Sequence, residues 1–224
     1  MLAELSTNPL GALIGLIALV IAITIHEFAH AWTSDRLGDP TPRLEGRLTL
    51  NPLAHLDPLG TILLIIARFG WGKPVRFDPF NLRHPRRDSA IISIAGPASN
   101  ILLAATCSLL LNLLLGLQTY SFSYSFIQLF IYFIIALLQS LIIYNVILAV
   151  FNLLPIHPLD GFKIVAGVLP EEHARQWAEL EGYGMMFLII LILPLSGGVS
   201  AISRIISPLI NVLLGILIPI ARFI

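Results

Sequence analysis

Charge and cysteine are both scarce in this 224-residue chain. Charged residues make up 12% of it and hydrophobic residues 57%, whereas a soluble globular domain carries roughly a quarter charged residues. The single cysteine, Cys107, excludes an internal disulfide and a cysteine-based zinc site, and its apolar neighbours predict a small buried side chain. The formal net charge is zero, so no basic surplus indicates a nucleic-acid partner. The composition therefore excludes an ordinary soluble domain.

Long stretches without charge locate the membrane segments. No ionisable side chain lies between Glu4 and His26, and between Asp88 and Asp160 only His157 can carry a charge near neutral pH. About 20 consecutive apolar residues cross a bilayer, so the second stretch is long enough for two passes. We therefore predict an all-α polytopic membrane protein, surrounded by membrane lipid, whose three core transmembrane helices are residues 10–32, 89–117 and 126–154.

The polar loop at residues 34–88 separates the first two spans and holds nine of the thirteen Lys and Arg residues. Because basic loops stay in the cytoplasm, we predict that this loop is cytoplasmic and that the protein lies in the cell membrane. Within the loop, Arg43–Leu50 alternates polar and apolar side chains, which is typical of a short strand or hairpin arm. Leu59–Phe69 is apolar but only about eleven residues long, and we interpret it as a re-entrant or interfacial element.

Residues 166–224 are predicted to be C-terminal membrane-associated segments. An acidic helix is expected to begin at Pro170–Glu172, since proline and glutamate favour the first turn of a helix. Two apolar runs then follow, Tyr183–Leu195 and Ile202–Ile220. The first run is short for a span, and Pro208 is expected to break the second.

The order of the spans brings two polar clusters together. The first and third spans cross the membrane in the same direction, and polar clusters lie at their ends, at His26–His30 and at Asn152–Asp160. Both clusters are therefore predicted to lie at a similar depth on the cytoplasmic side. Residues far apart in the sequence can form one site there.

The first cluster has the spacing of a metal site. His26 and His30 are four residues apart, so on a helix they share one face and can present two imidazoles to one ion. Zinc suits two imidazole ligands, and Glu27 beside them can accept a proton. Ionisable residues after a long apolar stretch are costly and usually functional, which favours this interpretation. The alternative is a polar cluster that only ends the span.

The second cluster offers a carboxylate in an irregular turn. Pro155 and Pro158 break the helix, and irregular backbone at membrane depth occurs where it lines a protein cavity. Gly161 is expected to supply backbone freedom beside Asp160. Asp160 is a candidate third ligand, since catalytic zinc commonly takes three protein ligands and leaves one position for water. The alternative is that Asp160 caps a helix beginning near Phe162.

Three motifs together resemble the site-2 protease family of intramembrane zinc metalloproteases. They are His-Glu-x-x-His at His26–His30, Gly-Pro-Ala-Ser-Asn at Gly96–Asn100, and Asn-x-x-Pro followed by Leu-Asp-Gly at Asn152–Gly161. The resemblance implies an intramembrane metalloprotease core at residues 1–165, one Zn²⁺ per chain and a transmembrane protein as substrate in regulated proteolysis. The chain has no room for the PDZ domain that many members carry, so it resembles a compact member.

The same resemblance implies roles for single residues. His26, His30 and Asp160 would be the zinc ligands, and Glu27 the general base. Asn152 would lie near the reacting carbonyl, where its amide could donate to the developing oxyanion. An interspan hydrogen bond that holds the unwound segment is the alternative role for Asn152.

Four further residues are candidates for contacting the substrate or orienting a ligand. Gly96 and Asn100 share a helix face, where Gly96 lets another helix approach and Asn100 either bonds to it or lines the site. His55 and His157 could orient a ligand, and the alternative for both is a surface histidine. Arg43–Leu50 is a candidate edge strand for pairing with an extended substrate, and an ordinary surface hairpin has the same pattern.

Two other functions fit parts of the pattern. A non-hydrolytic zinc-binding membrane protein, such as a transporter or a sensor, would use the same three ligands but has no use for Glu27. A different membrane zincin would take its third ligand from the acidic C-terminal helix, at Glu171, Glu172, Glu179 or Glu181. We predict hydrolysis, because zinc lowers the pKa of bound water to about 7 and Glu27 is placed to take the proton.

Overall fold

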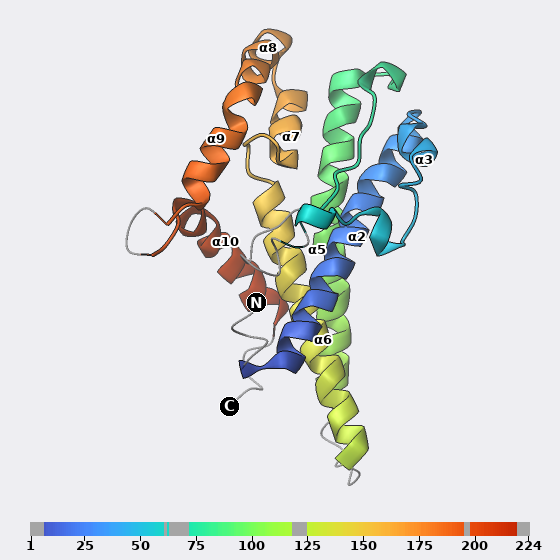
Figure 1. The fold of residues 1–224 in the computed structure, drawn as a ribbon, viewed down its shortest axis with the longest axis vertical. Helices are drawn as coiled ribbons and strands as arrows, with labels where there is room; N and C mark the ends of the chain where they lie inside the picture. The colour runs from blue at the N-terminus through green and yellow to red at the C-terminus, as the bar shows by residue number, and fades with distance from the viewer. Residues whose placement is uncertain (1–6, 61, 63–71, 118–124, 195–197, 219–224) are drawn as a thin grey trace.

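The computed structural model describes residues 7–60, 62, 72–117, 125–194 and 198–218. Within these ranges the chain is helical and contains no β-strand. Three of the described helices are long and apolar enough to cross a membrane (Figure 1): α2 (Pro9–Leu37), α5 (Pro85–Leu117) and α6 (Ser125–Asn152). They overlap the three spans predicted at 10–32, 89–117 and 126–154, so the predicted all-α architecture with three long apolar helices is confirmed.

Helix α2 has clear start and stop signals. Asn8 precedes the helix, and its side-chain oxygen accepts a hydrogen bond from the Gly11 N–H at 2.9 Å, while Pro9 occupies the first turn. At the other end Gly38 adopts a left-handed conformation with φ of 111°, which a residue with a side chain rarely adopts. The helix therefore runs without a break through the His26–His30 cluster.

The three long helices form one bundle. Each of them packs against the other two, and α2 and α6 run in the same direction while α5 runs in the opposite one (Figure 1). Small side chains let the helices approach closely, because association in a membrane depends on packing. Cys107 is buried in this core, as its apolar surroundings predict. The other fully buried core residues include Ala18, Ala104, Leu111, Ile142 and Val146.

The loop between α2 and α5 contains short helices where a strand was expected. Helix α3 (Thr41–Leu44) begins the segment, and the 3-10 helices η1 (Pro52–Ala54) and η2 (Pro79–Asn81) follow. The strand predicted at Arg43–Leu50, and with it the edge strand for substrate, is therefore wrong. Two features explain the difference, the prolines that start α3 and a turn at Gly46 with φ of 69°.

Arg47 shows why alternation misled in this loop. Its side chain is 2% exposed and donates to three backbone carbonyls, those of Ala54, Lys73 and Pro74. In the predicted strand, Arg47 would have faced solvent. In the structure it is buried instead, and its hydrogen bonds connect distant parts of an irregular loop. The predicted re-entrant element Leu59–Phe69 lies mostly outside the described residues.

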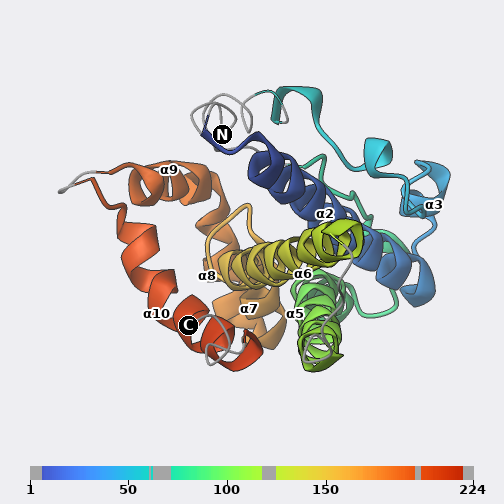
Figure 2. The ribbon, with the colours of Figure 1, turned by 90° about the horizontal axis from the view of Figure 1, so that it is seen from below.

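In the described C-terminal ranges, four helices follow the bundle: α7 (Asp160–Val168), α8 (Glu171–Glu179), α9 (Glu181–Ile192) and α10 (Ala201–Leu217). Helix α8 begins directly after Pro170, as predicted. Helices α9 and α10 are apolar but shorter than the crossing helices, and they lie to one side of the bundle (Figure 2). The break expected at Pro208 is wrong, because α10 continues through this residue. Proline is tolerated inside membrane helices, where neighbouring groups satisfy the freed carbonyl.

Candidate active site

Two histidines of α2 are pressed against the backbone of α5. His26 and His30 are 5% and 7% exposed, and they lie one turn apart on one face of α2. A Cβ added at Gly96 of α5 would lie 2.4 Å from His30 Nε2 and 2.6 Å from His26 Cε1. Real Cβ atoms do not approach other atoms so closely, so only glycine fits here. The two imidazoles are the neighbours that require Gly96.

Asp160 reaches the same place from the end of α6. Helix α6 ends at Asn152, an irregular turn follows, and α7 begins at Asp160 itself with Leu159 as its N-cap residue. The alternative that Asp160 caps a helix near Phe162 is therefore wrong. Gly161 is needed for a different reason than expected, because it is helical and its added Cβ would lie 2.3 Å from the carbonyl oxygens of Leu153 and Leu154.

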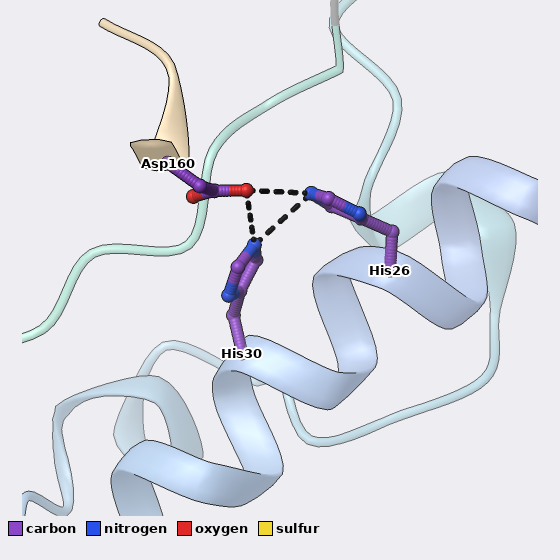
Figure 3. Close-up of side chains that lie close together, drawn as sticks. All are labelled: His26, His30 and Asp160. Atoms are coloured by element: carbon purple, nitrogen blue, oxygen red, sulfur yellow. Dashed lines mark hydrogen bonds and ion pairs between the residues drawn. The ribbon is translucent and has the colours of Figure 1, made fainter. Parts of the chain in front are cut away.

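The three side chains converge on one point (Figure 3). Asp160 Oδ2 lies 3.2 Å from both His26 Nε2 and His30 Nε2, and the two Nε2 atoms are 3.0 Å apart. Two ligand atoms about 2.0–2.1 Å from a zinc ion at tetrahedral angles lie roughly 3.3 Å from each other. The triangle therefore has nearly the dimensions of one face of a zinc coordination tetrahedron.

The protons on these groups also suit a cation. His30 Nδ1 lies 2.7 Å from the carbonyl oxygen of Ile92, which can only accept, so the ring donates there and Nε2 of the neutral ring carries a lone pair. His26 Nδ1 lies 2.6 Å from Asn100 Oδ1 in the same way. Asp160 Oδ2 is buried and has no hydrogen-bond donor among the residues that the structure describes. Three electron-pair donors that face one another repel unless a cation lies among them, so these residues fit zinc.

Glu27 is held by the loop that follows α2. Its Oε2 accepts a hydrogen bond from the Val75 N–H at 2.9 Å. The extended backbone around Val75 is fixed on one side by Arg47, which donates to the carbonyls of Lys73 and Pro74. On the other side Asp39 accepts from the Asp78 N–H at 2.8 Å. The loop thus forms one wall beside the general-base candidate.

Asp39 is the centre of a hydrogen-bonded cluster outside the membrane-spanning helices. Its two carboxylate oxygens accept from the hydroxyls of Ser34 and Thr41, the amide of Asn81 and two backbone N–H groups. Burial alone would raise the pKa of this carboxyl, but the hydrogen bonds from Thr41, Asn81 and Asp78 stabilise the charged form and hold the pKa below its usual value. The carboxylate is therefore the form that organises the loop.

Lys163 adds a positive charge near the site. Its Nζ lies 4.5 Å from the centroid of the Phe77 ring, which belongs to the same loop. Burial lowers the pKa of this ammonium, and the carboxylates of Asp160, Glu181 and Glu27 oppose that shift. Lys163 therefore links α7 electrostatically to the carboxylates on both sides of the site.

Three other residues predicted for the site, Asn152, His55 and His157, do not belong to the cluster of His26, His30 and Asp160. The Asn152 amide donates to Leu148 O at 3.0 Å, a bond within α6 rather than between spans. His55 is fully buried, with Nε2 2.8 Å from Thr49 O, so the surface alternative is wrong for it. His157 Nε2 lies 3.3 Å from Glu181 Oε1, which ties the turn to α9.

Two groups at the site were missed by sequence reasoning. Asn145 of α6 is fully buried, and its Oδ1 accepts from Asn100 Nδ2 at 2.7 Å. A polar amide inside a charge-free run was the signal that could have found it. The Val75 N–H that holds Glu27 is a backbone group, and no side-chain pattern marks it.

Among the described residues, His26, His30 and Asp160 form the only cluster of three metal-ligating side chains, so no third ligand comes from α8 or α9.

The chain is similar in sequence to known proteins. The family described as Peptidase family M50 matches residues 14–195. The Bacillus subtilis protein named "Putative zinc metalloprotease YwhC" is 36% identical over 196 residues, which cover 87% of this chain and 84% of that protein. Two mycobacterial proteins named "Putative zinc metalloprotease Rip2" also match. The Mycolicibacterium smegmatis protein is 36% identical over 189 residues (80% of this chain, 68% of that protein), and the Mycobacterium tuberculosis protein is 32% identical over 203 residues (86% and 73%).

No solved structure matches the chain at a significant level. The family match covers α5, α6 and all of α2 from residue 14 on, and it includes both motifs that form the cluster of His26, His30 and Asp160. The cluster itself has the donor atoms and the spacing that zinc requires. The chain therefore belongs to peptidase family M50, the site-2 protease family, and is an integral membrane zinc metalloprotease.

Proposed function

We propose that this protein cleaves a peptide bond within or near a transmembrane helix of another membrane protein, as a step of regulated proteolysis. The observation that carries the proposal is the convergence of three potential ligand atoms at 3.0–3.2 Å from one another, two of them on the membrane helix α2 and one at the first residue of α7. In this proposal His26, His30 and Asp160 hold one zinc ion, and Glu27 is the general base. The enclosing bundle excludes bulk water and lipid from the reaction.

Each side chain then has a defined task. Zinc, when bound, acts as a Lewis acid and lowers the pKa of a bound water. Glu27, oriented through Oε2 by the Val75 N–H, takes a proton from the attacking water and returns it to the leaving amine nitrogen. Asn100 and the Ile92 carbonyl hold the two imidazoles, and Gly96 leaves the space that they occupy. In this proposal the Asn152 amide, one N–H of which donates to Leu148 O, donates its other N–H to the reacting carbonyl.

The remaining candidates support these groups. His55 anchors the loop through Thr49 and through its own carbonyl, which accepts from the Lys73 N–H at 2.8 Å. His157 and Glu181 hold α9 against the turn before Asp160. In this proposal residues 1–165 are the catalytic core, residues 34–88 are a cytoplasmic loop, and residues 166–224 are membrane-associated and contact lipid.

A non-hydrolytic zinc protein is the weaker candidate. Glu27 is held at the site by a dedicated hydrogen bond from Val75, although it is not one of the three clustered ligand groups. A protein that only binds or transports zinc has no task for such a carboxylate. A protease needs it for proton transfer.

Replacing Glu27 separates catalysis from metal binding. We expect Glu27→Gln to keep about one zinc per chain and the thermal stability of the wild type, but to cleave a transmembrane substrate about 10²–10⁴-fold more slowly, because the base is gone. The measurement is cleavage in reconstituted bilayers together with zinc analysis. Asp160→Ala should lose zinc, and Glu179→Ala, which removes an exposed carboxylate of α8, is the control that should keep it. Undiminished cleavage by Glu27→Gln would contradict the mechanism.

The proposed sidedness can be tested separately. If the basic loop is cytoplasmic, single cysteines from Arg86→Cys and Glu172→Cys, made in a Cys107→Ala background, are protected from an impermeant thiol reagent in intact cells. A cysteine from Ser123→Cys, between the second and third spans, should react. Labelling of the first two cysteines on opposite faces would place the two motifs on different sides of the bilayer and would refute the shared site.

A further inference from the structure

A line of side-chain hydrogen bonds crosses the bundle from α6 to the zinc-ligand candidate His26. Asn145 Nδ2 donates to Leu141 O of its own helix at 2.8 Å. Asn145 Oδ1 accepts from Asn100 Nδ2 at 2.7 Å, and Asn100 Oδ1 lies 2.6 Å from His26 Nδ1. Asn100 and Asn145 are both 0% exposed, so water does not compete for these groups. The line therefore connects three helices through buried amides.

The direction of this line is fixed by backbone carbonyls, which can only accept. Leu141 O requires the Asn145 amide nitrogen on its side, so Asn145 Oδ1 must face Asn100. Asn100 Nδ2 donates to that oxygen and also lies 3.2 Å from the carbonyl oxygen of Ala22. A flipped Asn100 would place its own oxygen against two acceptors. Asn100 Oδ1 must therefore face His26, and His26 must donate from Nδ1.

We propose that Asn145 is a positioning residue of the metal centre, which sets the tautomer of His26 by fixing the orientation of the Asn100 amide. With its proton on Nδ1, His26 offers the lone pair of Nε2 to the metal. The opposite tautomer carries a proton on Nε2 and cannot be a ligand through that atom. The inference rests on the ligand role of His26 proposed above.

The two histidines depend on different parts of the fold. His30 donates directly to Ile92 O, a backbone group of α5 that cannot turn around. His26 depends on a side-chain amide whose two ends have nearly the same shape, and only a partner of known polarity distinguishes them. Asn145 is that partner. Removing its oxygen leaves Asn100 with one backbone acceptor and makes the flipped amide cheaper.

Zinc affinity tests the proposal directly. Asn145→Leu fills the same space but has no acceptor, and we expect it to bind zinc about tenfold more weakly, as measured by chelator competition on the full chain in bilayers. Asn145→Asp should bind within about twofold of the wild type, because a protonated carboxyl in this buried position donates its O–H to Leu141 O and still accepts from Asn100 through its other oxygen. Asn112→Leu is the matched control, since Asn112 makes the same local bond, to Ser108 O at 2.9 Å, and should leave affinity unchanged.

A spectroscopic measurement separates positioning from a structural role. In full-length protein labelled with ¹⁵N-histidine and stripped of metal, His26 should be protonated on Nδ1 in the wild type and in Asn145→Asp. In Asn145→Leu a second population protonated on Nε2 should appear, while the His30 signal stays unchanged. If Asn145→Leu does not fold, Asn145→Ala removes the same acceptor and should give the same two results.

The possible failures are distinct. Wild-type protein that binds no zinc would refute the proposed metal centre itself. Wild-type affinity in Asn145→Leu, or an unchanged His26 tautomer in it, would refute only the role of Asn145. Weaker binding by Asn145→Asp than by Asn145→Leu would also refute it, because packing rather than an acceptor would then be what the position supplies.

Discussion

The two halves of the bundle of α2, α5 and α6 are made from the same helices but bury different chemistry. One half buries apolar side chains that contact each other by shape alone, including Ala18, Ala104, Cys107, Leu111 and Ile142. The other half buries imidazoles and amides that bond to specific atoms, including His26, His30, Asn100 and Asn145. Contacts by shape have no direction, whereas hydrogen bonds fix which atom faces which. The same membrane helices thus serve as scaffold in one half and as a directed site in the other.

This difference explains why one glycine of α5 has no room for a side chain whereas another has ample room. Gly96 lies in the polar half, where an added Cβ would lie 2.4 Å from a proposed zinc ligand. Gly116 lies near the other end of the helix, where an added Cβ would meet no atom of the described part of the chain within 4 Å. A methyl group is the smallest possible addition, so this pair of positions is a sensitive test of the comparison.

The largest effect is expected for Gly96→Ala. The new methyl group must displace the imidazoles of His26 and His30, and displaced imidazoles no longer match the geometry of zinc. We expect zinc affinity to fall at least ~100-fold and cleavage to fall to background, as measured by chelator competition and substrate cleavage. Gly116→Ala is the control and should retain both properties. Full zinc affinity in Gly96→Ala would show that the polar half is looser than its contacts indicate.

Truncating a side chain in the apolar half should lower the stability of the protein but leave its zinc affinity unchanged. Leu111 is 0% exposed, and Leu111→Ala leaves a cavity, which costs about 2–5 kcal/mol of stability in well-packed cores. The zinc affinity of the folded protein should not change, because the apolar side chain of Leu111 forms no hydrogen bond with any residue of the site. Thermal unfolding in detergent, combined with zinc competition, measures both quantities. A large loss of zinc affinity here would mean that the two halves are not separable.

The smallest effect is expected at Asp39, whose hydrogen-bonded cluster lies in the loop outside the bundle, and this effect should depend on pH. Asp39→Asn puts an amide nitrogen against hydrogen-bond donors, and we expect it to weaken the loop by about 1–3 kcal/mol at pH 7. Because the folded-state pKa of Asp39 is lowered, its contribution is present above the unfolded value of about 3.9 and is lost as the pH falls through the folded value.

Limited proteolysis of the loop as a function of pH measures this effect. The wild type should be more resistant than Asp39→Asn at pH 7, and the two should converge in acid once the carboxyl is protonated. An equal difference at all pH values would show that the shape of Asp39, and not its charge, holds the loop beside Glu27.

Much of this architecture was predictable because it follows from local rules. Spans are visible as runs without charge, since a bilayer excludes charge over about 20 residues. The pairing of His26 and His30 follows from helical periodicity, and their approach to Asp160 follows from the shared direction of the first and third spans. The loop at Arg43–Leu50 was mispredicted as a strand because eight alternating residues carry little information against prolines and a buried arginine.

The sequence by itself therefore determined the membrane class, the three spans, the order in which they cross and the residue types that zinc requires. The tertiary structure decided which atoms meet. Only the packing of α5 on α2 shows that Gly96 leaves room for two imidazoles, and only the crossing of three helices shows that Asn145 orients Asn100. The reason is physical. Hydropathy and helical period are properties of neighbours in the chain, whereas the polarity of a hydrogen bond depends on partners 45 and 74 positions away.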